Sequence, residues 1–162
     1  MTQCPALAAG RRVLTDVESA RLDKGVDYVH AEIDKLHSKG RISADKASKL
    51  RGLVTGSPSK DAFADADVVI EAVFEEMKVK QQVFAEVEAV VSETCVLATN
   101  TSSLSVSEMA SKLRHPERVV GLHFFNPVAV LPLLEVVRGA QTDDASLATA
   151  FAVLSLSYCK KK

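Results

Sequence analysis

The sequence predicts an α/β fold in which an open, mostly parallel β-sheet is covered by helices on both faces. Short apolar runs rich in β-branched residues have the length of strands buried on both sides, and segments with helical spacing alternate with these runs. Parallel strands need crossover connections that a helix supplies, so the alternation favours a doubly wound sheet. No internal repeat or linker interrupts the pattern.

Length and composition exclude several classes of protein. The 162 residues suffice for one domain of ordinary size, and 47% hydrophobic residues can bury a core, which argues against disorder. A net charge of -1 and an aromatic content of 5% argue against a nucleic-acid partner. Cys4, Cys95 and Cys159 form no CxxC pair, and no apolar run approaches the ~20 residues of a membrane span. We therefore expect an intracellular protein with no metal site.

A helical hairpin follows the first strand candidate, at residues 12–15. Apolar residues then recur in steps of four and three, which places them on one face of a long helix. Gly40 is suited to ending this helix, and Ser43 to capping a second one that runs to about Leu50. The apolar face of the long helix consists of Leu22, Val26, Val29, Ile33 and Leu36.

Strands and helices alternate over the rest of the chain. Buried strands are predicted at 67–73, 95–99, 119–124 and 133–137. Between them, Ser105 and Glu108 have the spacing of a capping box that opens a helix to about Leu113, and Asp143 is suited to capping a last helix from Asp144 to about Leu156. Another helix is predicted on a face formed by Val79, Val83, Val87 and Val90.

Polar residues follow the predicted strands, where open α/β sheets bind their ligands. Singly, an Asp or Asn after a strand is more often a turn former or a helix cap. Asp16 after the first strand is suited to accepting the hydroxyls of an adenosine ribose, which favours NAD over NADP. However, none of the glycines forms the G-x-G turn that should hold the pyrophosphate. The other residues at strand ends are Glu75, Asn100, Thr101, Ser102, His123 and Asn126.

His123 is a candidate general base, although a lone His at a strand end is usually structural. Residues 124–127 form a bulky wall and a stiff turn beside it, and Glu135 stands in the next apolar run, where a carboxylate needs a partner. A carboxylate beside a histidine fixes its tautomer and favours the imidazolium that forms when the base takes a proton. The sequence therefore indicates a base dyad.

Three long motifs carry a resemblance to a known family: residues 67–75, 98–104 and 121–127, in this order and spacing. With them, the stretch from about 12 to 139 closely resembles the NAD-binding domain of L-3-hydroxyacyl-CoA dehydrogenases, and is nearest to the dehydrogenase part of multifunctional fatty-acid oxidation proteins. The resemblance implies a Rossmann-like sheet that lacks its first strand and glycine loop, with a helical-hairpin insertion at about 17–52. It also implies oxidation of a (S)-3-hydroxyacyl-CoA to a 3-oxoacyl-CoA with NAD.

The resemblance also assigns roles to residues. By position, His123 matches the catalytic base, Glu135 its orienting partner, and Ser102 the hydroxyl that bonds the reacting oxygen. The positions that match cofactor contacts are Asp16 at the adenosine ribose, Glu75 and Lys80 in the next βα unit, Ser102 and Asn126 near the nicotinamide, and Asn100.

Two departures from the family pattern leave alternatives open. Family members have a strand and glycine loop before the segment matching 1–10, and they continue into a helical domain that carries a further catalytic Asn. We therefore expect residues 1–162 to be a partial domain, truncated at both ends and without turnover on its own. A noncatalytic, degenerate Rossmann-like binding or structural module is the alternative. A related NAD-dependent hydroxyacid dehydrogenase is a third reading, which residues 123–127 argue against.

The resemblance implies partners and a location as well. An acyl-CoA is the expected substrate, and the expected assembly is a homo-oligomer or a parent multifunctional complex. The expected location is the cytoplasm in a bacterium, or an organelle matrix in a eukaryote.

Overall fold

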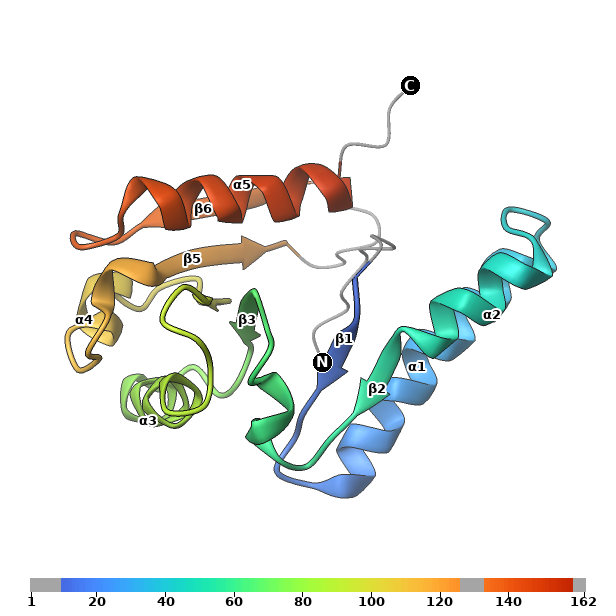
Figure 1. Cartoon of the computed structure of the whole chain (residues 1–162), viewed down its shortest axis with the longest axis horizontal. Helices are drawn as coiled ribbons and strands as arrows, with labels where there is room; N and C mark the ends of the chain where they lie inside the picture. Colours follow the sequence, from blue (N-terminus) through green and yellow to red (C-terminus); the bar gives the residue numbers. More distant parts are fainter. Residues whose placement is uncertain (1–9, 126–132, 159–162) are drawn as a thin grey trace. The chain divides into compact units, whose positions relative to one another are not determined.

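The computed structural model describes residues 10–125 and 133–158, which fall into two compact units. The N-terminal unit comprises the described residues up to Ala62, and the C-terminal unit begins at Phe63. Figure 1 shows the strands and helices of each unit along the chain. No helix in the described stretches combines the length and apolar character needed to cross a membrane.

The N-terminal unit is a βααβ arrangement whose two short strands pair in parallel. It consists of β1 (Arg12–Leu14), α1 (Ser19–Ser38), α2 (Ala44–Gly52) and β2 (Val54–Gly56). In the register of this pair, Arg12 lies opposite Val54. The first strand confirms the sequence prediction, but β2 was missed because its flanking glycines and Pro58 were interpreted as breaks. A 3-10 turn, Lys60–Phe63, follows β2.

The predicted hairpin corresponds to α1 and α2. Gly40 has a φ of 66°, a left-handed conformation that glycine adopts without steric cost, and it ends α1 as expected. The Ser43 hydroxyl accepts a hydrogen bond from the Lys46 backbone N–H, 3.3 Å away, and so caps α2. Ile33 of α1 packs with Ala47 and Leu50 of α2 in a small apolar cluster.

The C-terminal unit contains a four-stranded sheet in the order β3-β4-β5-β6. The first three strands are parallel, and β6 pairs antiparallel with β5. This arrangement confirms the prediction of a mostly parallel sheet. The elements of the unit are β3 (Val68–Glu71), α3 (Met77–Glu88), β4 (Val96–Thr99), α4 (Val106–Ala110), a 3-10 turn (Pro116–Arg118), β5 (Val119–Phe124), β6 (Leu134–Arg138) and α5 (Asp144–Tyr158).

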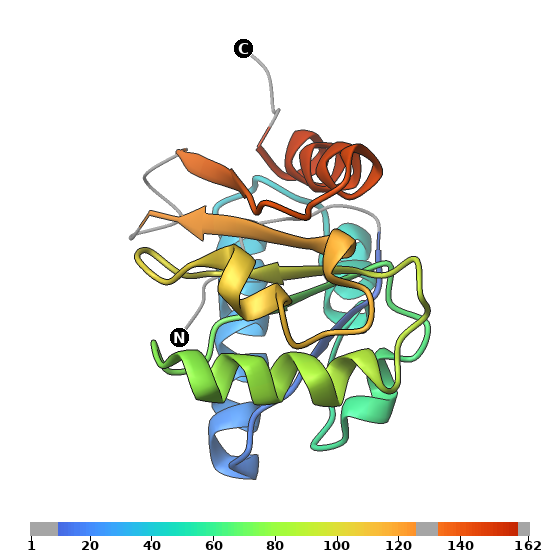
Figure 2. The same ribbon diagram turned by 90° about the vertical axis from the view of Figure 1, so that its left-hand side faces the viewer.

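Helices cover both faces of this sheet, with α5 on one side and α3 and α4 on the other (Figures 1 and 2). On the α5 side, side chains from β4 and β5 pack with Ala150 of α5 in the main apolar cluster. β4 is buried along its whole length, as expected for a strand covered on both faces. Ser105 and Asp143 cap α4 and α5 as predicted, although α4 ends at Ala110, short of Leu113.

The buried face of α3 differs from the predicted one. Lys80, Phe84, Val87 and Glu88 are its buried residues, whereas Val79 and Val83 are only half-buried and Val90 lies beyond the helix. Apolar spacing alone misplaced this face because Lys80 and Glu88 are buried as ion pairs.

Glu88 and Arg118 form a buried ion pair near the amino ends of β4 and β5. Glu88 accepts backbone N–H bonds of 3.0 Å from Arg114 and His115, and Arg118 Nη2 lies 3.3 Å from Glu88 Oε1. Arg118 Nη1 also donates to the backbone oxygen of Ser92. Burial raises the pKa of Glu88, but the two backbone N–H bonds and the Arg118 guanidinium outweigh it and hold that pKa below its ordinary value of 4.5. A buried ion pair therefore closes this end of the sheet, and among the described residues Arg118 Nε is left without a hydrogen-bond partner.

Gly121 allows β5, β6 and α4 to approach closely. A Cβ added there would lie 2.7 Å from Val137 Cβ and 3.2 Å from Val106 Cγ2. No side chain larger than hydrogen therefore fits at this position without displacing β6 or α4.

We predict that Gly121→Ala destabilises the protein by about 1–3 kcal/mol, because the added methyl overpacks the contact between β5 and β6. Gly52→Ala is the matched control, since nothing lies within 4 Å of a Cβ added there. The control should change the stability by less than about 1 kcal/mol. Urea unfolding followed by circular dichroism measures both, and equal effects of the two substitutions would contradict the packing argument.

Candidate functional site

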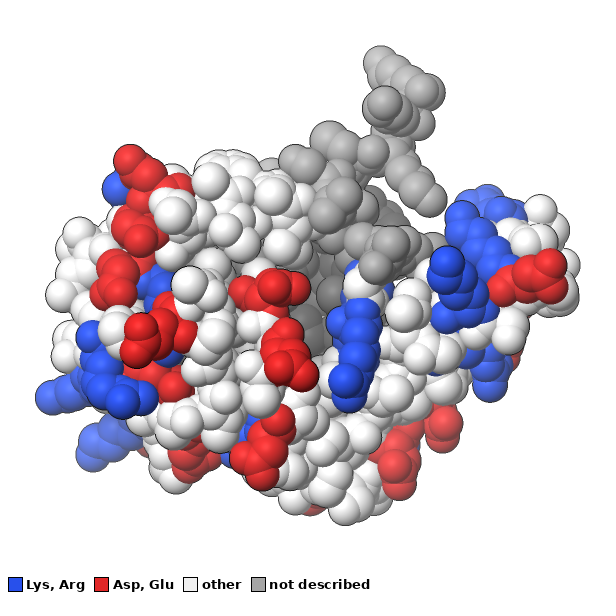
Figure 3. All heavy atoms as spheres, viewed as in Figure 1, with Lys and Arg blue, Asp and Glu red and all other residues white. Residues whose placement is uncertain are grey.

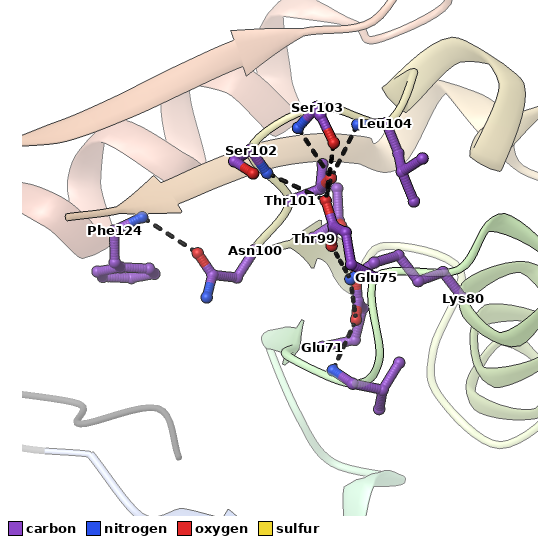
Figure 4. Close-up of polar contacts among 11 residues, drawn as sticks. Glu71, Glu75, Lys80, Thr99, Asn100, Thr101, Ser102, Ser103, Leu104 and Phe124 are labelled. Atoms are coloured by element: carbon purple, nitrogen blue, oxygen red, sulfur yellow. Dashed lines mark hydrogen bonds and ion pairs between the residues drawn. The ribbon is translucent and has the colours of Figure 1, made fainter. Parts of the chain in front are cut away.

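The candidate site lies at the carboxyl ends of β3, β4 and β5. Because these strands are parallel, their carboxyl ends meet at one edge of the sheet. Glu71 at the end of β3 lies opposite Thr99 at the end of β4. The loops that follow carry Glu75 after β3 and residues 100–103 after β4, and Figure 4 shows these side chains gathered in one cluster.

Glu75 links the loop after β3 to the loop after β4. Its Oε1 accepts a hydrogen bond from the Thr101 hydroxyl, from the Ser102 backbone N–H at 3.3 Å and from the Ser103 hydroxyl at 3.4 Å. Its Oε2 lies 3.3 Å from Lys80 Nζ. The side chain is 41% exposed, so part of this carboxylate still faces outward. Among the described residues, only Lys80 contacts Oε2, which leaves that oxygen able to accept another hydrogen bond.

The surroundings of Glu75 favour its ionised form. Partial burial opposes ionisation and by itself raises the pKa of this carboxyl. The hydrogen bonds from Thr101 and Lys80, the positive charge of Lys80 and the backbone N–H of Ser102 outweigh burial. The pKa of Glu75 therefore lies below its ordinary value of 4.5.

Lys80 is the buried centre of the cluster. Its side chain is fully buried, and Nζ lies 2.9 Å from Glu71 Oε1 and 3.0 Å from Glu71 Oε2. From the sequence we predicted that Lys80 contacts a cofactor. In the structure its ammonium contacts Glu71, which is buried, and Glu75, which is exposed. Within this unit, Glu75 therefore lies between Lys80 and the solvent.

Asn100 connects the ends of β4 and β5. Its Oδ1 accepts a hydrogen bond from the Phe124 backbone N–H at 3.1 Å. Its own backbone N–H donates to the backbone carbonyl oxygen of Glu71 at 3.0 Å. This half-buried side chain therefore holds the turn after β4 against the last residue of β5 (Figure 4). Ser102, two residues further on, is exposed.

His123 and Glu135 form the predicted pair. They lie opposite each other in the antiparallel β5–β6 ladder, and His123 Nδ1 is 2.9 Å from Glu135 Oε2. An ionised carboxylate only accepts hydrogen bonds, so Nδ1 carries the proton and Nε2 is the basic nitrogen. The Phe125 ring packs against the imidazole, with 4.5 Å between the ring centres. The His123 side chain is 21% exposed, so solvent or a ligand reaches it.

Two predicted residues are not among the described residues of the C-terminal unit. Asp16 belongs to the N-terminal unit, where its Oδ1 accepts the Glu18 backbone N–H at 3.0 Å just before α1. This is the turn-forming role that an Asp after a strand commonly has, and its other oxygen remains for a ligand. Asn126 lies outside the described residues.

The sequence reasoning missed several residues of the cluster. Glu71 carries the same signal that identified Glu135, since each is a carboxylate within an apolar run. Thr99, which donates its hydroxyl to Glu71, has no such signal because threonine is common in strands. Phe74, beside Glu75, is 72% exposed and offers an apolar surface at the same edge.

The chemistry of these groups fits a dinucleotide. Ribose hydroxyls need anionic acceptors, and Glu75 is an ionised, half-exposed one. The exposed Ser102 hydroxyl both donates and accepts, and the exposed Phe74 ring suits a planar heterocycle. Figure 3 shows both acidic and basic side chains on the visible surface of each unit.

Known proteins match this chain over most of its length. The family model described as 3-hydroxyacyl-CoA dehydrogenase, NAD binding domain, matches residues 2–160. A fatty acid oxidation complex subunit alpha of Idiomarina loihiensis is 38% identical over 139 residues, which are 86% of this chain and 19% of that protein. The peroxisomal fatty acid beta-oxidation multifunctional protein AIM1 of Arabidopsis thaliana is 40% identical over 143 residues, covering 88% of this chain and 20% of that one.

A solved structure has the same fold. The (S)-3-hydroxybutyryl-CoA dehydrogenase PaaH1 of Ralstonia eutropha superposes with a TM-score of 0.85 at 32% identity, over 91% of this chain and 52% of that one. The chain thus spans about a fifth of the length of these curated relatives and about half of that structure. With a family match over nearly its whole length, the chain belongs to the 3-hydroxyacyl-CoA dehydrogenase NAD-binding domain family, whose cofactor is NAD.

Proposed function

We propose that this chain is the NAD-binding part of an enzyme that oxidises (S)-3-hydroxyacyl-CoA to 3-oxoacyl-CoA in fatty-acid β-oxidation. One observation carries the proposal: His123 Nδ1 lies 2.9 Å from Glu135 Oε2, in a half-exposed pair at the ligand-binding edge of the sheet. Alcohol oxidation requires a base for the hydroxyl proton, and a histidine oriented by a carboxylate supplies one.

In this reaction His123 Nε2 accepts the proton of the substrate's 3-hydroxyl. Glu135 holds the Nδ1 proton, orients the ring and stabilises the imidazolium that forms. Ser102 donates its hydroxyl hydrogen to the reacting oxygen as negative charge develops there. NAD, when bound, supplies the acceptor for the hydride that leaves the carbon bearing the 3-hydroxyl.

The cofactor contacts that we propose come from both units of the chain. Glu75 accepts a ribose hydroxyl with Oε2, the oxygen that is not shared with the loop after β4. Lys80 supports Glu75 from within, and Asn100 with Ser102 borders the nicotinamide. Asp16 binds the adenosine ribose with the oxygen that does not cap its own turn. Asn126 completes the nicotinamide side.

Partners and location follow from the relatives. The matching curated proteins are named as a subunit of a fatty acid oxidation complex and as a multifunctional protein, one of them peroxisomal. We infer that this domain acts on an acyl-CoA within such a multifunctional assembly. Its place is the cytoplasm in a bacterial cell or the matrix of an organelle in a eukaryotic one.

We predict that NAD binds to the 162-residue chain and that Glu75→Gln weakens this binding, by about tenfold for one charged hydrogen bond. Because the pKa of Glu75 lies below its ordinary value of 4.5, affinity should persist to a lower pH than it would with an ordinary glutamate. It should decline only at lower pH, as the carboxylate gains its proton. Calorimetric titration across pH measures both effects. Absence of binding both by the unaltered chain and by a chimera in which it replaces the matching segment of the Idiomarina loihiensis relative would refute the proposed function and favour a noncatalytic module.

We predict that His123→Gln lowers the rate of NADH formation from 3-hydroxybutyryl-CoA by about 10²–10⁴-fold while NAD affinity is unchanged. The assay uses a chimera in which this chain replaces the matching segment of the Idiomarina loihiensis relative. His115→Gln is the control, because His115 also contacts a glutamate, Glu117 at 3.2 Å, but at the amino end of β5. Equal loss of activity in both variants would contradict the role of His123.

A further inference from the structure

Glu71 is a buried carboxylate to which the proposed mechanism gives no role. Its side chain is 2% exposed, and both oxygens are fully occupied. Oε1 accepts from Lys80 at 2.9 Å and from the Thr99 hydroxyl, while Oε2 accepts from Lys80 at 3.0 Å and from the Val73 backbone N–H at 3.1 Å. Glu71 therefore has no capacity left for a ligand, and among the residues that the structure describes its only charged contact is Lys80.

Lys80 is shared unequally between two carboxylates. Nζ makes two contacts with Glu71 but one, at 3.3 Å, with Glu75. Two carboxylates and one ammonium carry a combined charge of -1. Glu71 and Lys80 neutralise each other inside the unit. The uncompensated charge belongs to Glu75, the exposed member of the three.

We propose that Glu71 is a positioning residue: by engaging Lys80 with both oxygens, it prevents this lysine from fully neutralising Glu75 and drawing it inward. Glu75 then remains a net anion whose Oε2 accepts a hydrogen bond from a hydroxyl of the ligand. The proposal deepens the proposed function, because it rests on Glu75 being a contact of NAD.

The alternative arrangement explains why a competitor is needed. A buried ammonium requires a counter-charge, and without Glu71 the remaining carboxylate in contact with Lys80 is that of Glu75. Glu75 would then satisfy Lys80 rather than a ligand, and its negative charge would be cancelled. Thr99 and the backbone N–H of Val73 hold Glu71 in place, so the competition has a defined geometry.

The groups that face Glu75 within this unit come from several elements. Helix α3 contributes the Lys80 ammonium, and the end of β3 contributes Glu71 behind it. The loop after β4 contributes the uncharged Thr101, Ser102 and Ser103. The balance between Lys80 and Glu71 is therefore the main source of the electrostatic field at Glu75 in this cluster.

The test measures the pKa of the Glu75 carboxyl by NMR, with ¹³C-labelled glutamate and no NAD present. Glu71→Gln removes the competing charge, so the pKa of Glu75 should fall. Lys80→Met leaves two carboxylates side by side, so it should rise, by about 1 or more. The double variant removes both charges and should give a value between those of the single variants. Glu71→Gln and the double variant leave no buried charge unpaired, so they decide the question even if Lys80→Met does not fold.

NAD affinity gives the second readout on the same variants. Glu71→Gln should weaken NAD binding by about tenfold, the effect of one lost charge-assisted hydrogen bond. The double variant should recover part of that loss, because Glu75 is again a net anion. Glu76→Gln is the matched control, since it removes the same charge from the exposed residue next to Glu75 and should change neither the pKa nor the affinity appreciably.

The outcomes separate the two proposals. If Glu71→Gln leaves the pKa of Glu75 unchanged, or if its NAD affinity equals that of the unaltered chain, the positioning role is overturned. If neither the unaltered chain nor its chimera with the Idiomarina loihiensis relative binds NAD, the proposed function fails, and the pKa series then decides whether Glu71 controls the charge of Glu75.

Discussion

The register of β5 between β4 and β6 determines where the functional side chains lie. Parallel pairing with β4 brings the end of β5 beside the loop that starts at Asn100, whose side chain bonds the Phe124 backbone. Antiparallel pairing with β6 places Glu135 directly opposite His123. A shift of one residue would send these two side chains to opposite faces. Gly121 keeps β6 close enough for the register to hold.

The site separates two kinds of charge. Inside, Lys80 and Glu71 are enclosed and mutually satisfied, and they hold the ends of β3 and β4 and the start of α3 together. Outside, Glu75 and the His123–Glu135 pair are half-exposed and retain capacity for a ligand. Glu75 stays accessible because the buried Lys80, rather than the ligand itself, helps to fix its position.

The chain belongs to the 3-hydroxyacyl-CoA dehydrogenase NAD-binding domain family. The family model covers nearly the whole chain, and the superposed dehydrogenase of Ralstonia eutropha has the same fold at 32% identity. The opposite end of the sheet carries the Glu88–Arg118 pair, which is buried and in which Glu88 accepts backbone N–H bonds. Two acidic–basic clusters on one sheet thus differ in exposure: one closes the core, and the other borders the candidate site.

The alternation of apolar runs was enough to predict the mostly parallel sheet and the caps at Ser43, Ser105 and Asp143, because these depend on short-range pattern and hydrogen bonding. The same pattern missed β2, because glycines next to a short strand look like breaks. It also predicted the wrong buried face for α3, because a buried lysine does not appear in a pattern of apolar residues. Residue type and position in the sequence were enough to predict His123, Glu135 and Glu75 as candidate site residues. Only the tertiary structure revealed that Glu71 binds Lys80, since a contact between a strand end and a helix depends on how the chain packs.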